Sequence, residues 1–138
     1  MSGSTIVSPN TFDTTLLTDN AVGAITAAFA RQVGDSLSGL FTTQQAGNYT
    51  FALADRGTQV ESTSASAVTF TVPPSGSVAF LLNTVIGFRQ YGAGQITLVA
   101  GSGVTLRTSS SLTTRAQYST GSVQLRAANE WVVSGDMT

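Results

Sequence analysis

Apolar residues recur with two different periods along the 138-residue chain. Within residues 22–40 they are three or four positions apart, in a stripe formed by Ile25, Phe29, Val33, Leu37 and Leu40. This spacing places the side chains on one face of a helix. We therefore expect one short amphipathic helix within residues 21–41, packed either on its own β domain or on another subunit.

From residue 47 onward the period changes to two. Apolar and polar residues alternate in YTFALAD, AVTFTV, TVIGFRQY, QITLVA, VTLRT, GSVQLRA and EWVVSG, and more weakly at residues 58–63. Turn signals separate these stretches about every 8–12 residues, which is typical of sandwiches and jelly rolls. We expect a mainly β fold: an antiparallel β sandwich of jelly-roll type over residues 47–138, with Trp131 in its core.

Two glycine pairs, Gly92-Ala-Gly94 and Gly101-Ser-Gly103, lie between predicted strands. A phosphate-binding loop needs glycines that open a helix, with a lysine or a third glycine. Strand patterns follow both pairs, and the chain has no lysine. We therefore interpret both pairs as hairpin turns, in which glycine supplies positive φ.

Residues 1–20 are polar with isolated apolar pairs and are expected to form an extended N-terminal arm. Such an arm could cross a neighbouring subunit and add main-chain hydrogen bonds at an exposed strand edge. The candidate interaction residues of the whole chain are Ile6, Val7, Leu16, Leu17, Phe29 and Tyr91.

The amino-acid composition limits which catalytic and binding sites the chain can form. The chain has no histidine and no cysteine, its six basic residues are all arginines, and its net charge is −1. Acyl transfer then lacks an ordinary base, and a specific metal site lacks its usual ligands. Scattered arginines give no basic stripe for nucleic acid. No signal peptide and no membrane-length apolar run is present. We expect no catalytic, cofactor-binding or metal-binding residues, and no nucleic-acid or membrane partner.

Two further functions remain compatible with these residues. A glycosidase needs only two carboxylates, and Asp55 and Glu61 flank a predicted turn, where solvated carboxylates are ordinary. A sugar-binding surface needs exposed aromatic rings beside polar groups, and the candidates are Tyr91, Tyr118 and Trp131. Tyr91 borders a turn and is expected to be the more exposed, whereas Trp131 is expected in the core.

Residues 48–137 contain YTFALADRGTQVES, AVTFTVPPSGSVAF, GFRQYGAGQITLVAGSGVTLRT and RAQYSTGSVQLRAANEWVVSGDM in this order. These motifs resemble a β module that recurs in virion proteins of tailed bacteriophages. The helix AITAAFARQVGDSL is similar to the short helix that precedes such modules in fibre and decoration proteins. The resemblance implies a virion structural protein without transferable catalytic residues.

Only 9% of the residues are charged, as expected of a protein that packs into a lattice. The chain is expected to be complete from its initiator methionine, and it is too short for the shaft of a fibre. We therefore expect a non-enzymatic capsid decoration (cement) protein. It would be made in the host cytoplasm and lie on the capsid exterior, where it bridges major capsid proteins as a homo-oligomer, either dimer or trimer. The alternative is a tail-fibre or receptor-binding module that contacts host surface polysaccharide.

Overall fold

The structure, a computed structural model, describes residues 41–138. The expected arm and all but the last residue of the expected helix lie outside this range, as do Ile6, Val7, Leu16, Leu17 and Phe29. The described region is mainly β, which confirms the predicted class. Its strands are β1 (Thr42–Gln45), β2 (Tyr49–Thr50), β3 (Gln59–Ser62), β4 (Val68–Val72), β5 (Val85–Gln90), β6 (Ile96–Ala100), β7 (Thr105–Thr108), β8 (Thr120–Ala127) and β9 (Glu130–Gly135).

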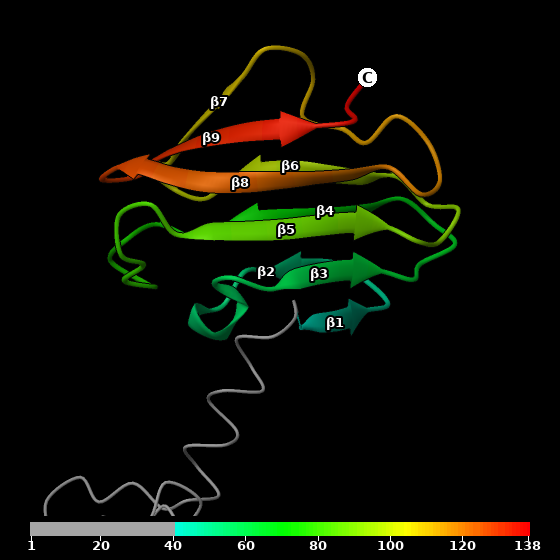
Figure 1. The fold of residues 1–138 in the computed structure, drawn as a ribbon, viewed down its shortest axis with the longest axis horizontal. Coiled ribbons are helices and arrows are strands. Elements are labelled where there is room, and N and C mark those ends of the chain that lie inside the picture. The colour runs from blue at the N-terminus through cyan, green and yellow to red at the C-terminus, as the bar shows by residue number, and fades with distance from the viewer. Residues whose placement is uncertain (1–40) are drawn as a thin grey trace, which may run out of the picture. The chain divides into compact units, whose positions relative to one another are not determined.

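The chain crosses repeatedly between two sheets. One sheet has six strands in the order β1-β3-β5-β8-β9-β7, and the other has three in the order β2-β4-β6. In Figure 1, β1, β3 and β5 run in one direction across the front layer, and β2, β4 and β6 run in the opposite direction behind them. From β1 to β6 the chain is therefore a flattened coil, and each turn of this parallel coil adds one strand to each sheet.

The expected antiparallel jelly roll is wrong in its strand pairing. Five of the seven strand pairs are parallel, and the antiparallel ones are β5–β8 and β8–β9. Alternation of apolar and polar residues shows which face of a strand is buried, but it is the same for parallel and antiparallel neighbours. The period of two therefore predicts the strands correctly and leaves their partners undefined.

The core is formed by inward-facing side chains of both sheets. Register places Val60 beside Phe88 in the larger sheet and Phe70 beside Leu98 in the smaller one. All four are at most 2% exposed. Trp131 on β9 is 2% exposed, which confirms its predicted place in the core.

The glycine turns are crossovers between the two sheets, so the hairpin interpretation is wrong. Residues 91–95 join β5 to β6 and lie directly on the preceding β3–β4 turn: Gly92 N–H donates to Ser62 O at 2.9 Å and Gly94 N–H donates to Ser64 O at 3.0 Å. A Cβ atom on Gly92 or Gly94 would overlap the carbonyl oxygen of Ser64 or Ser66. Glycine at these two positions thus provides room for stacked backbones, whereas Gly103 does have the expected positive φ, at 76°.

Candidate functional site

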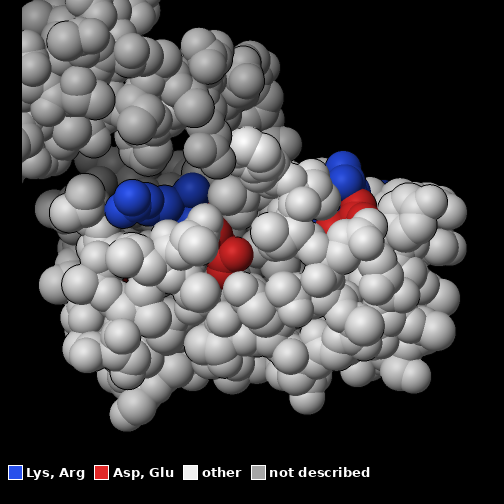
Figure 2. All heavy atoms as spheres, turned by 90° about the horizontal axis from the view of Figure 1, so that it is seen from below, with Lys and Arg blue, Asp and Glu red and all other residues white. Residues whose placement is uncertain are grey.

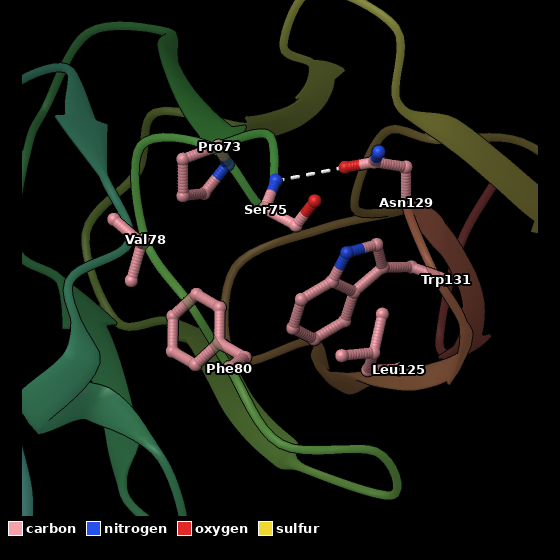
Figure 3. A pocket seen from close by; sticks show the side chains of 7 residues that line it. All are labelled: Pro73, Ser75, Val78, Phe80, Leu125, Asn129 and Trp131. Atoms are coloured by element: carbon pink, nitrogen blue, oxygen red, sulfur yellow. Dashed lines mark hydrogen bonds between the residues drawn. The ribbon is translucent and has the colours of Figure 1, made fainter.

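A shallow pocket lies beside Trp131 but is too small for a substrate. Its volume of about 10 Å³ matches about one water molecule. Phe80 packs edge-on against Trp131 with ring centroids 5.3 Å apart, and Ser75 N–H donates to the Asn129 side chain at 2.8 Å (Figure 3). The lining residues are Pro73, Ser75, Val78, Phe80, Leu125, Asn129 and Trp131.

The two carboxylates of the candidate glycosidase pair are buried, whereas their position beside a predicted turn predicts solvated ones. Asp55 is 3% exposed and Glu61 is 4% exposed. Asp55 Oδ2 accepts hydrogen bonds from the Tyr49 hydroxyl at 2.8 Å and the Ala52 N–H at 2.7 Å. Desolvation, together with the hydrogen bond to Asp55 and its charge, raises the pKa of Tyr49 to about 12. Asp55 therefore fastens the turn after β2.

Glu61 joins three strands of the larger sheet. Its Oε1 accepts a hydrogen bond from Gln44 Nε2 at 2.8 Å, and its Oε2 accepts one from Arg89 Nε at 2.7 Å. Gln44, Glu61 and Arg89 lie on β1, β3 and β5. This arrangement gives both carboxylate oxygens structural partners.

The end of the coil at β6 is closed. Residues 112–114 run along the outer edge of β6, where Leu98 N–H donates to Leu112 O at 2.8 Å and Thr114 N–H donates to Ile96 O at 2.9 Å. In the larger sheet, the antiparallel strands β8 and β9 and the short β7 follow β5. We call this region, β6–β9 with residues 112–114, the closed end.

The other end of the coil, formed by β1 and β2, has no such cover among residues 41–138. Neither strand has a second neighbour within that range. Phe41 O accepts from Gln59 N–H at 2.7 Å and Gln45 O accepts from Thr63 N–H at 2.9 Å. Backbone groups of successive residues point to opposite edges of a strand. The N–H and C=O groups of Thr42 and Gln44 therefore lie along the outer edge of what we call the open end.

The open end also lacks charged residues on its edge strand. Its sequence is TTQQ, with exposed side chains at the first three positions, and Phe41 beside it is 58% exposed. Figure 2 views the molecule from this side: acidic and basic atoms lie together in two small groups, and the rest of the described surface in view is uncharged. Nothing on this strand resembles the charges or prolines with which proteins usually block an edge.

A second exposed feature is a pair of tyrosines. Tyr91 follows β5 and is 53% exposed, and Tyr118 precedes β8 and is 64% exposed. Their ring centroids are 5.8 Å apart with the planes at 72°. The structure thus brings together two of the three aromatic residues predicted as candidates for a sugar-binding surface. The third, Trp131, lies in the core.

A buried glutamine supports this tyrosine pair. Gln90 is fully buried, and its Nε2 donates to the carbonyl oxygens of Gly92 and Ala93 at 3.1 and 3.2 Å. Its Oε1 accepts from Thr114 Oγ1 at 2.5 Å, and its backbone carbonyl accepts from Tyr118 N–H at 2.6 Å. Gln90 therefore positions both segments that carry the exposed rings.

An ion pair fastens the other side of the Tyr118 turn. Arg115 donates to Asp136 through Nε at 2.7 Å and through a terminal nitrogen at 2.9 Å, and Ser119 Oγ donates to the same carboxylate at 2.7 Å. The hydrogen bonds from Arg115 and Ser119 lower the pKa of Asp136 below its usual value. The carboxylate is therefore ionised at neutral pH, and the local charge is balanced.

Neither Gln90 nor Ser119 is among the predicted site residues, although the sequence carries a signal for Gln90. Ile86, Phe88 and Gln90 are two residues apart, so Gln90 is a polar residue in the phase of the buried face. A polar side chain at such a position must have buried hydrogen-bond partners. Ser119 shows no comparable signal, because it lies in a turn.

No protein-family model, curated protein or solved structure matches the chain. In residues 41–138, no helix is long and apolar enough to cross a membrane.

Proposed function

We propose that this protein is a non-enzymatic structural protein of a tailed-phage virion. As a capsid decoration protein it lies on the capsid exterior, contacts the major capsid protein and other copies of itself, and stabilises neighbouring capsid subunits. The observation that carries the proposal is the contrast between the two ends of the coil. A coil of stacked strands exposes pairing groups at its ends unless they are capped. Here residues 112–114 cover β6 and the edge strand β7 carries Arg107, whereas β1 and β2 have neither cover nor charge within the described residues.

The open end is suited to pairing with a strand from a neighbouring protein. Main-chain hydrogen bonds from an added strand provide affinity at such an edge. The outward groups of Thr42 and Gln44 offer two donors and two acceptors, and no edge charge opposes an approaching strand. Each bond contributes a net of about 0.5–1.5 kcal/mol, and many copies on a shell multiply this modest contact.

Immunogold labelling of particles of the phage that encodes the chain tests the location. We expect label over the heads of intact particles. Label confined to the tail tip would favour the tail-fibre alternative, and particles without label would contradict both locations.

A proline substitution tests the edge itself. Thr42→Pro removes an outward N–H but spares the bonds to β3, and proline is tolerated on edge strands. Attachment of the purified protein to particles should weaken about tenfold, which corresponds to about one hydrogen bond, while the thermal midpoint stays nearly unchanged. Thr42→Ala, which retains the N–H, is the matched control. Equal attachment of both variants would exclude this edge as the contact.

A further inference from the structure

The backbone of Tyr118 adopts a conformation that tyrosine normally avoids. Its φ is 73°, and Ser119 N–H donates to Ala116 O at 3.0 Å, so Tyr118 is the third residue of a four-residue turn. Glycine or asparagine is preferred at that position. The two other non-glycine residues with positive φ in the described region, Asn83 and Asn129, are both asparagines.

Burial of the ring does not offset this cost. A left-handed conformation of such a residue costs about 1–3 kcal/mol. The ring nevertheless remains 64% exposed and contacts another exposed ring, that of Tyr91. Strained residues of this kind cluster at binding sites, where the surrounding structure holds them in place. Here the hydrogen bonds of Gln90, Arg115 and Asp136 hold the turn.

The chemistry of the surface indicates the kind of ligand. The two rings meet edge to face at 72°, so one ring offers a face to the C–H face of a pyranose ring and the other lies beside it. Tyrosine adds a hydroxyl to each ring and loses little conformational entropy on binding. The Gln117 side chain, which donates to Tyr91 O at 3.0 Å, adds an amide beside the rings for the sugar hydroxyls.

Charge and the flanking residues favour a neutral saccharide over two other ligand classes. Arg115 is paired through two nitrogens with Asp136, so the loop presents no unbalanced cation for a nucleic-acid phosphate or an acidic sugar. A stable protein interface buries about 800 Å² per partner. The residues that flank the two tyrosines in the chain are small or polar, among them Ala93 and Gln117, so the two rings suit a sugar unit better than a protein partner.

We propose that Tyr91 and Tyr118 form a binding site for an uncharged saccharide, in which a pyranose ring stacks on one of the two exposed tyrosine rings and contacts the other. This activity goes beyond attachment to a capsid and does not depend on the open end. It would allow a virion protein to hold glycans of a host or of its surroundings.

NMR titration of the full-length protein with maltohexaose, cellohexaose and a β-1,3-linked glucose hexamer tests the proposal, with a galacturonic acid hexamer as the acidic counterpart. At least one neutral hexamer should shift the ring signals of Tyr91 and Tyr118 at millimolar concentration. No shift with any neutral hexamer, or tighter binding of the acidic one, would overturn the proposal.

Substitutions separate binding from structure. Tyr118→Gly should weaken binding at least about tenfold, as for other aromatic contacts at the centre of a site, while the thermal midpoint stays equal or rises because the strain is relieved. Tyr118→Phe should retain binding, and Leu82→Ala, at an exposed apolar residue of another loop, should leave it unchanged. Unaltered binding by Tyr118→Gly would show that the ring is not part of the binding site. A lower thermal midpoint would show that the ring has a structural role instead. Broadening of the same ring signals by phage particles without saccharide would assign the pair to a protein contact and equally overturn the proposal.

Discussion

The two ends of the coil are built from the same kind of strand but are finished differently. At the closed end, residues 112–114 cover β6, and the edge strand β7 carries Arg107 within 3.5 Å of Glu130. At the open end, β1 has outward hydrogen-bonding groups and no charged residue. Short, charged or covered edges prevent unwanted pairing. The closed end therefore carries the features that block pairing, whereas the open end is the one to which the proposed function assigns recognition.

The largest expected effect is at the closed end. Trp131→Ala removes a ring that is 2% exposed and packed against Phe80, so it should lower the free energy of unfolding by about 3–5 kcal/mol. Phe41→Ala at the open end removes a ring that is 58% exposed and should change the free energy of unfolding by less than about 0.5 kcal/mol. Urea denaturation of both variants measures the contrast, and equal losses would show that the open end is part of the core. If Trp131→Ala is insoluble, Trp131→Phe provides a milder comparison.

The second-largest loss of stability is expected at the stacked turns between the two ends. Gly94→Ala forces a Cβ atom against the backbone of Ser66 and should cost about 1–3 kcal/mol. Gly76→Ala is the matched control, because a Cβ atom there meets nothing within 4 Å. Thermal denaturation should therefore separate the two variants. A Gly94→Ala protein as stable as the control would mean that the turns of the coil are not closely stacked.

High pH should affect the β2 side of the open end selectively. Because the pKa of Tyr49 is raised to about 12 in the folded protein, the stability from its neutral hydroxyl is fully present below the unfolded value near 10. That stability is lost as the pH rises from about 10 to about 12. Absorbance titration should show one of the three tyrosines ionising late. Tyr49→Phe should remove the late transition, and its persistence would contradict the Tyr49–Asp55 contact.

The smallest expected effect is that of a surface ion pair at the closed end. Arg126 donates to Glu130 at 2.8 Å, but its side chain is 66% exposed. Arg126→Ala should lower the free energy of unfolding by about 0.2–1 kcal/mol, and less in high salt. A salt-independent loss of several kcal/mol would show that charge rather than packing stabilises this end.

The sequence predicted where the strands lie better than how they pair. The alternation around Phe70, Leu98 and Val123 placed all three in the core, because one face of each strand must be buried. The polar strand β1 has no alternation and was not anticipated. The alternation in YTFALAD predicts Leu53 on the same face as Phe51, but Leu53 begins a 3-10 turn at Leu53–Asp55 and is 45% exposed.

Parallel pairing leaves one further signal in the sequence, a constant spacing between paired residues. Gln59 pairs with Gly87 and Val68 pairs with Ile96, and each pair is separated by 28 residues. A constant offset of this kind is the mark of stacked repeats. This repeat signal is weak here because the first turn of the coil is shorter: Thr42 pairs with Gln59, 17 residues away.

The contact between the two tyrosines likewise could not be predicted from the local sequence. Position next to a turn indicated that Tyr91 is exposed, but no local pattern indicates that Tyr118 contacts it. The two residues meet because β5 pairs with β8, and that long-range pairing is not encoded in either segment alone.

Hydrogen exchange resolved at single amides tests the open end most directly. In the free full-length protein, the outward amides of Thr42 and Gln44 should exchange rapidly, while the amide of Leu98 at the closed end remains protected. After attachment to phage particles, Thr42 and Gln44 should become protected and Leu98 should not change. Protection of Thr42 and Gln44 already in the free protein, or continued rapid exchange after attachment, would contradict the account.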